Sequence, residues 1–158
     1  MNKPRSPALK RALKIILIII AIFIAVFFLY CNNTRLANKQ TRLYYELLKD
    51  SLRSKGLAPR LLVVSTKRFR WHNTIQVKLS GAATKSRHVE GDAIDFIVFD
   101  VNRDGSSNQK DVDLVYGILD KQIIAKKGGI GTYKTAHSFF YKQMIHIDTR
   151  GYRARWSE

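Results

Sequence analysis

Residues 86–113, SRHVEGDAIDFIVFDVNRDGSSNQKDVD, decide both the fold of this chain and its chemistry. They hold more than half of the 12 acidic residues in a 158-residue chain whose formal net charge is +16. The middle of the stretch, AIDFIVFD, is apolar and β-branched and predicts a buried strand. Groups that bind metal ions lie on both sides of this strand. The stretch therefore indicates metal binding, at two neighbouring sites.

Other segments extend this pattern in both directions. RLLVVST (60–66), TIQVKL (74–79) and QMIHIDTR (143–150) predict strands, and apolar residues at helical spacing predict helices over 40–54 and 112–125. Gly56 and Pro59 end the first helix, and KKGGIG (126–131) ends the second. The mixture predicts an α+β fold, in which helices pack on a small antiparallel sheet within a single domain.

An uncharged run, IILIIIAIFIAVFFLY, occupies residues 15–30. With Ala12, Leu13 and Cys31 at its ends it reaches the roughly 17 to 25 residues that cross a bilayer. A cleaved signal peptide is the alternative, but LYCNNTRLA is a poor cleavage site. We therefore expect an uncleaved signal anchor at 15–31. Basic residues precede it and keep the N-terminus cytoplasmic: Lys3, Arg5, Lys10, Arg11 and Lys14.

The anchor divides the chain into four parts. We expect a cytoplasmic basic tail (1–14), the transmembrane anchor (15–31), a tether (32–43) and a periplasmic domain (44–158). Because the basic residues are dispersed and no common nucleic-acid-binding motif accompanies them, an anionic wall polymer or a membrane surface suits the charge better than nucleic acid. Cys31 is the only cysteine, which excludes a disulfide within the chain.

A first set of residues has the order of a zinc site. Ser86, His88, Gly91, Ala93 and Asp95 form the pattern S-x-H-x-x-G-x-A-x-D, in which Gly91 permits a tight turn. MIHID adds His146 on a second predicted strand. Three ligands (His88, Asp95 and His146) with an open fourth position are typical of catalytic zinc, Zn²⁺.

These residues resemble the M15 family of zinc peptidases, the D-alanyl-D-alanine carboxypeptidase and murein endopeptidase group. The resemblance covers about residues 61–156. It includes VVSTKRFRWHNTIQ with Arg68, LSGAATKSRH before the first motif, GGIGTY, and HIDTRGYRARW near the end. It implies that His88, Asp95 and His146 bind zinc and that the domain hydrolyses peptide bonds in peptidoglycan stem peptides or cross-links.

The catalytic base departs from the family pattern, because Gln143 and Met144 stand where an acidic residue or histidine is usual. Asp148 is our first candidate, either as the base or as a group that orients a ligand, because residues i and i+2 of a strand share a face. Glu90 and His137 are weaker candidates. Arg68 is a candidate for oxyanion stabilisation or substrate binding, and Ser86 for substrate binding or for capping the turn.

A second set of residues resembles a calcium loop. DVNRDGSSNQKD (100–111) places oxygen groups at positions 1, 3, 5, 7, 9 and 12 of an EF-hand loop and Gly105 at position 6. Aspartate at the last position is similar to the dockerin type. An Asp- and Asn-rich turn without an ion is the simpler alternative. The predicted ligands of structural Ca²⁺ are Asp100, Asn102, Asp104, Ser106, Asn108 and Asp111.

Three functions remain open from sequence. The leading interpretation is a membrane-anchored zinc peptidase that acts on peptidoglycan. The absence of an acidic residue before His146 favours the second, a non-catalytic wall-binding or regulatory module that retains metal. A zinc peptidase acting on protein or another small peptide is the third.

Overall fold

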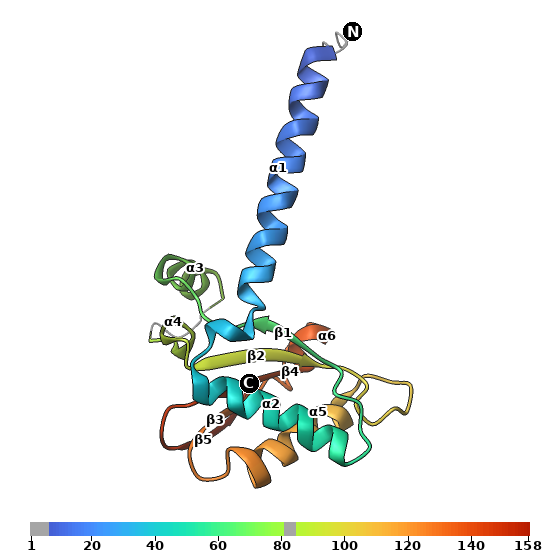
Figure 1. Cartoon of the computed structure of the whole chain (residues 1–158), viewed down its shortest axis with the longest axis vertical. Coiled ribbons are helices and arrows are strands. Elements are labelled where there is room, and N and C mark those ends of the chain that lie inside the picture. Colours follow the sequence, from blue (N-terminus) through green and yellow to red (C-terminus); the bar gives the residue numbers. More distant parts are fainter. Residues whose placement is uncertain (1–6, 81–84) are drawn as a thin grey trace.

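The computed structural model describes residues 7–80 and 85–158. It has the α+β architecture expected from sequence, with one long N-terminal helix leading to a domain built on a single five-stranded sheet (Figure 1). The strand order is β1-β2-β4-β3-β5. The strands are β1 (Leu61–Ser65), β2 (Ala93–Val98), β3 (Gly128–Thr132), β4 (Met144–Asp148) and β5 (Arg153–Ser157).

The long helix α1 (Pro7–Cys31) is long and apolar enough to cross a membrane. After it come the short 3₁₀ helix η1 (Thr34–Leu36) and helix α2 (Lys39–Ser54). Asn33 and Asn38 cap these two elements, and the Asn38 side chain also donates to Asp92 and Thr149. The segment expected to be a tether is therefore short, is bound to the domain, and contains the first turn of α2. The basic residues Lys3 and Arg5 lie outside the described residues.

One face of the sheet forms the hydrophobic core. Alternate residues of β2 and β4 point to it, together with Val63 of β1 and Ile130 of β3. Helices α2 and α5 (Gln109–Ile118) contribute the facing apolar side chains, and the π-helical turn η2 (Leu119–Ile123) continues α5. The core residues on β2 and β4 are Ile94, Phe96, Val98, Ile145 and Ile147. The other face is left for Asp95, His146 and Asp148.

The prediction of a strand at residues 74–79 is wrong, because this segment belongs to helix α3 (Arg70–Ser80). Six residues that alternate apolar and polar can be read as either element, and α3 finds apolar partners on α1 rather than a partner strand. Two short helices, α4 (Arg87–Glu90) and α6 (Phe139–Lys142), were not predicted. Residues 81–84, within the expected LSGAATKSRH segment, lie outside the described residues.

The sheet is antiparallel as expected, except that β3 and β5 pair in parallel. Neither β3 nor β5 was predicted from sequence. Three of the five residues of β3 are glycine, which lowers its intrinsic preference for strand. Strand β3 borders β4 and β5 borders β3, so the two strands extend the face on which His146 and Asp148 lie.

Candidate metal centre

The backbone brings His88, Asp95 and His146 together from three elements. Asp95 of β2 and His146 of β4 are directly opposite partners in the antiparallel ladder. His88 lies in α4, which Ser86 caps by accepting a hydrogen bond from the His88 amide. Gly91 ends α4 at φ 78°, a conformation that side chains disfavour, and a Cβ there would come 3.1 Å from the Leu36 carbonyl oxygen.

The three side chains are buried and their ligand atoms lie within 4.8 Å of one another. Oδ2 of Asp95 is 3.0 Å from Nε2 of His88, and Oδ1 of Asp95 is 2.7 Å from Nδ1 of His146. Among the residues that the structure describes, this is the one group of three or more histidine, cysteine or acidic side chains close enough to hold a metal ion. The group could therefore hold a metal ion, as the sequence predicted.

Hydrogen bonds on the outer side of each ring orient both histidines. Nδ1 of His88 lies 2.6 Å from the Thr66 carbonyl oxygen, so it carries the proton and leaves the Nε2 lone pair towards Asp95. Nε2 of His146 lies 3.1 Å from Oδ2 of Asp148, which leaves Nδ1 towards Asp95. Acceptors behind metal-binding imidazoles fix the ring orientation in this way.

One buried atom tests whether the group fits a metal. Nε2 of His88 is buried without a hydrogen-bond partner, although Asp95 is close to it. A buried polar nitrogen left unpaired is costly, and a metal ion would satisfy it. Two imidazole nitrogens and one carboxylate are donors that zinc accepts. The residues therefore fit a zinc-type ion.

The charges of the group also favour binding a cation. Burial would raise the pKa of Asp95, but the imidazoles of His88 and His146 outweigh it and hold that pKa well below its usual range. Burial lowers the pKa of His88 from its ordinary value. Burial also opposes the charged form of His146, but its hydrogen bonds to Asp148 and Asp95 raise its pKa to about 9. A metal ion would replace the proton that these carboxylates attract.

Asp148 lies behind His146 and is completely buried. Its carboxylate accepts hydrogen bonds from the Gly129 amide at 3.1 Å and from the Arg150 amide at 3.0 Å. The Arg150 guanidinium also donates to it through Nε and Nη2. Asp148 thus shares a face with His146, as expected, but contacts the nitrogen that points away from Asp95.

Two glycines of β3 make room for this arrangement. A Cβ on Gly129 would overlap the Asp148 carboxylate, with its Cγ only 2.8 Å away. A Cβ on Gly131 would overlap the indole of Trp156 on β5, which lies against the His146 ring at a centroid distance of 5.3 Å. The Arg150 guanidinium covers the same indole at 4.7 Å. Neither Trp156 nor Gly129 was predicted from sequence to have a role, although GGIGTY was the signal for this packing.

The candidate substrate residues occupy different positions. Arg68 contacts the metal group directly, because its Nη2 donates to Oδ2 of Asp95 at 2.9 Å and its Nε donates to the Ser65 hydroxyl. Ser86 has the capping role that the sequence offered as its alternative. Glu90 and His137, the weaker candidates for the base, are exposed.

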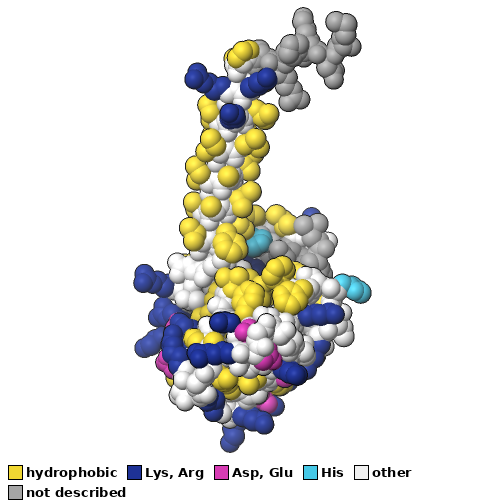
Figure 2. Space-filling model, turned by 90° about the vertical axis from the view of Figure 1, so that its right-hand side faces the viewer, with side chains coloured by type: hydrophobic (Ala, Val, Ile, Leu, Met, Phe, Trp, Pro, Cys, Tyr) yellow, Lys and Arg dark blue, Asp and Glu magenta, His cyan; other side chains and the backbone are white. Residues whose placement is uncertain are grey.

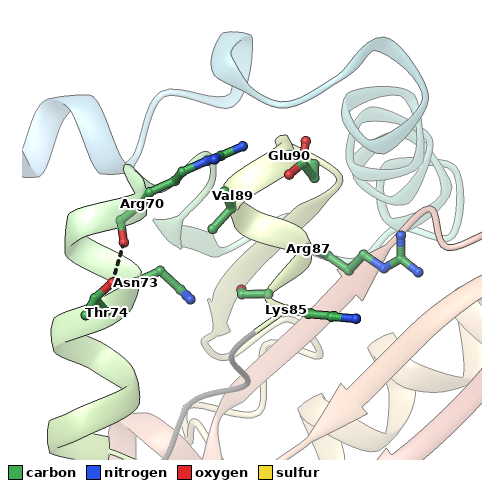
Figure 3. Close-up of a pocket in the computed structure, with 8 residues that line it drawn as sticks. Arg70, Asn73, Thr74, Lys85, Arg87, Val89 and Glu90 are labelled. Carbon is green, nitrogen blue, oxygen red and sulfur yellow. Dashed lines mark hydrogen bonds between the residues drawn. The ribbon is translucent and has the colours of Figure 1, made fainter.

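A pocket of about 540 Å³ lies beside the metal group, between α3 and α4. Figure 3 shows Asn73 of α3 and Val89 of α4 on either side of this space, whereas Arg87 points away from α3. None of the three metal-binding candidates lines it, but Ser86 and Glu90 do. The pocket is therefore adjacent to the metal group rather than part of it.

The predicted calcium loop follows β2 and leads into α5. Asn102 and Asp104 accept hydrogen bonds from the amides two residues later, and Arg103 and Gly105 have φ angles of 63° and 87°. Asp111 is fully buried and accepts from the amides of Val101, Asn102 and Asn108.

Two aspartates of the loop, Asp100 and Asp111, bear on calcium binding in opposite ways. One carboxylate oxygen of Asp100, Oδ1, is buried without a partner, while the other pairs with Arg60 at 2.9 Å. Asp111, however, already uses both oxygens to cap backbone amides, and so closes the loop and begins α5. The loop has the turns of a calcium loop, but within the described residues its carboxylates form no second group of metal-binding distances.

Comparison with known proteins gives no relative: no family model matches the chain, and neither the curated proteins nor the solved structures contain a match.

Proposed function

We propose that this protein is a membrane-anchored zinc peptidase that hydrolyses peptide bonds in peptidoglycan. The observation that carries the proposal is the buried group His88, Asp95 and His146, in which hydrogen bonds to the Thr66 carbonyl and to Asp148 orient both imidazoles towards one carboxylate. The S-x-H-x-x-G-x-A-x-D pattern and its resemblance to zinc peptidases support the same function.

Zinc is the ion that this group suits best. Two histidines and one carboxylate are the ligands of several catalytic zinc sites. When bound, zinc would lower the pKa of a coordinated water to about 7, which supplies a nucleophile at neutral pH. The chain would supply the remaining requirements, which are orientation of the ligands and recognition of the substrate.

Arg68 and Asp148 take different parts in this proposal. The Arg68 side chain donates to Asp95 and is 16% exposed, against 6% for Asp95, so it can bind a substrate carboxylate or an oxyanion. Asp148 is buried and fully hydrogen-bonded, so we assign it the orienting role for His146 rather than that of the base. Ser86 holds α4, and with it His88, in place.

The compartment follows from the anchor. Helix α1 would cross the cytoplasmic membrane with the basic N-terminus inside, and the domain would face the periplasm. A net charge of +16 would favour an anionic wall polymer over a basic or neutral substrate.

We further propose that one structural calcium ion occupies the loop 100–111. The unpartnered Oδ1 of Asp100 and the positive φ angles at Arg103 and Gly105 support it. The ion would fix the exit of β2, the strand that carries Asp95. Loop closure by Asp111 alone is the alternative.

The test of the peptidase is direct. The full chain in detergent, supplied with zinc, is incubated with purified peptidoglycan and with isolated stem peptides, and the products are analysed by mass. Hydrolysis that disappears in His146→Ala supports the proposal. A protein that binds zinc and retains wall fragments without cleaving them is the non-catalytic module instead. Cleavage of unrelated peptides alone would indicate the third interpretation.

A further inference from the structure

Aromatic rings join the end of α1 to the start of α3. Phe69 stacks on Tyr30 at a centroid distance of 4.8 Å, and Trp71 lies 6.3 Å from Phe27. Phe69 and Trp71 also stack on each other at 6.1 Å. Figure 1 shows α3 beside the last turns of α1, above the sheet. The position of α3 along the α1 axis is therefore defined by ring contacts.

These rings remain exposed despite their contacts. Phe69 and Trp71 keep 45% and 55% of their surface accessible. On the other side of the α1 base, α6 exposes Phe139, Phe140 and Tyr141 by 49%, 57% and 50% (Figure 1). Outside α1, every exposed phenylalanine or tryptophan among the described residues lies in these two segments. Figure 2 shows hydrophobic side chains gathered on the domain directly below the base of α1.

The depth of α3 relative to a membrane follows from α1. The apolar helix runs from Pro7 to Tyr30, so Phe27 and Tyr30 lie in its last turn. If α1 crosses a bilayer, this turn lies at the membrane–water interface, where tryptophan and tyrosine are favoured. Because Phe69 and Trp71 contact these two residues, the start of α3 lies at the same depth.

The charge near both segments has one sign. The described residues 67–80 and 134–147 contain lysine and arginine but no aspartate or glutamate. Arg70 and Lys78 belong to α3, and Lys142 belongs to α6. Basic side chains beside interfacial aromatic rings suit the phosphates of anionic lipids.

We propose that α3 and α6 seat the domain on the same bilayer that α1 crosses, with their aromatic rings among anionic phospholipid headgroups. This inference rests on the proposed membrane anchor but not on the proposed peptidase activity. The edge strand β1 contacts α1, and the metal ligands lie one and two strands further on, at about 4.8 Å per strand. The candidate metal centre is thereby held close to the membrane surface.

The chain has two tryptophans, so the contact of the aromatic surface with lipid can be measured by tryptophan fluorescence. The full-length Trp156→Phe variant, whose only tryptophan is Trp71, is reconstituted into vesicles of phosphatidylcholine and phosphatidylglycerol. We expect Trp71 emission at short wavelength, loss of quenching by aqueous acrylamide, and quenching by lipids brominated near the headgroup. The matched Trp71→Phe variant reports Trp156 on the metal face of the sheet, and brominated lipids should leave it unquenched. If Trp156→Phe does not fold, the emission of Trp71 is obtained by subtracting the spectrum of Trp71→Phe from that of the native chain.

Other outcomes distinguish the transmembrane anchor from the docking of α3 and α6 on the bilayer. A chain that alkaline carbonate extracts from the vesicles has no spanning helix, and both inferences fail together. A chain that resists extraction but whose Trp71 stays open to acrylamide overturns the docking while the anchor stands. Trp71 could also be protected from acrylamide without being quenched by brominated lipids. If that protection is lost when the protein is diluted in the membrane, a second copy of the chain covers the rings, and the proposal is overturned. Loss of lipid quenching in pure phosphatidylcholine would support the anionic headgroup.

Discussion

Asp148 contacts His146 on the side of the ring that faces away from Asp95. Its Oδ2 lies 3.1 Å from Nε2, whereas Nδ1 of the same ring lies 2.7 Å from Oδ1 of Asp95. The two nitrogens of the His146 ring therefore have different partners. Asp148 contacts Nε2, the nitrogen through which the ring is oriented, and Asp95 contacts Nδ1. This relationship favours the orienting role over that of the base, the two roles that the strand position alone left open.

Asp148→Asn should consequently weaken metal binding. The amide keeps the shape but removes the charge that holds the His146 ring and pairs with Arg150. Loss of such a partner typically lowers metal affinity about 10- to 100-fold. Zinc titration and turnover are measured on the same sample, and turnover should recover when zinc is raised to saturation. Normal zinc affinity with turnover lowered about 10²- to 10⁴-fold would show instead that Asp148 is the base.

Gly129→Ala should damage the same site from the opposite side. The added Cβ meets the Asp148 carboxylate, which has no room to move because it is completely buried. Overpacking of this kind costs about 1 to 3 kcal/mol, so both the melting temperature and zinc affinity should fall. Gly117→Ala in α5 is the matched control, because nothing lies within 4 Å of its added Cβ. It should be neutral or stabilising by about 0.5 to 1 kcal/mol. Equal effects of the two substitutions would contradict the close packing of Gly129 against Asp148.

The sequence predicted the elements whose apolar pattern is compatible with only one type of secondary structure. Strands β1, β2 and β4 and helices α2 and α5 lie where periodicity placed them. The pattern ending at Asp95, together with MIHID, identified all three side chains of the group that could hold a metal ion. Strand β3 escaped prediction because its glycines have no strand preference of their own. These glycines are required by contacts with residues distant in sequence, because a Cβ at Gly129 or Gly131 would overlap Asp148 or Trp156. Helix α3 was misread because its partners, Phe27 and Tyr30, belong to a helix expected to be buried only in lipid.

Calcium should raise the stability of the native chain if the loop 100–111 binds it. An ion that binds only the folded state adds RT ln(1 + [L]/Kd), about 2.7 kcal/mol at a hundredfold excess over Kd. Thermal melts with calcium and with a calcium-selective chelator should differ, and Asp104→Ala should remove the difference. Asp113→Asn, which removes an exposed carboxylate outside the loop, is the control and should preserve it. Identical melts of the native chain in the two conditions would leave Asp111 as the group that closes the loop without an ion.

The ion pair between Asp120 of η2 and two arginines of β5 predicts how stability depends on acid. Arg153, the stronger influence, and Arg155 both donate hydrogen bonds to the Asp120 carboxylate and lower its pKa from 3.8 to about 2. Because the folded pKa lies below the unfolded value, the unfolded chain binds the proton more readily as pH falls. The contribution of Asp120 is therefore complete above about pH 4 and is lost as the pH falls towards 2.

Asp120→Asn should remove that part of the acid sensitivity. Denaturant unfolding of the native chain and the variant is compared at several pH values, and the difference in the free energy of unfolding should shrink between pH 4 and 2. Asp50→Asn, which loses an exposed carboxylate paired within α2, controls for the change in net charge. The comparison also tests the position of β5, because Arg153 and Arg155 reach η2 only if β5 lies alongside β3. A difference that stays constant across this pH range would mean that Asp120 is not paired with β5 in solution.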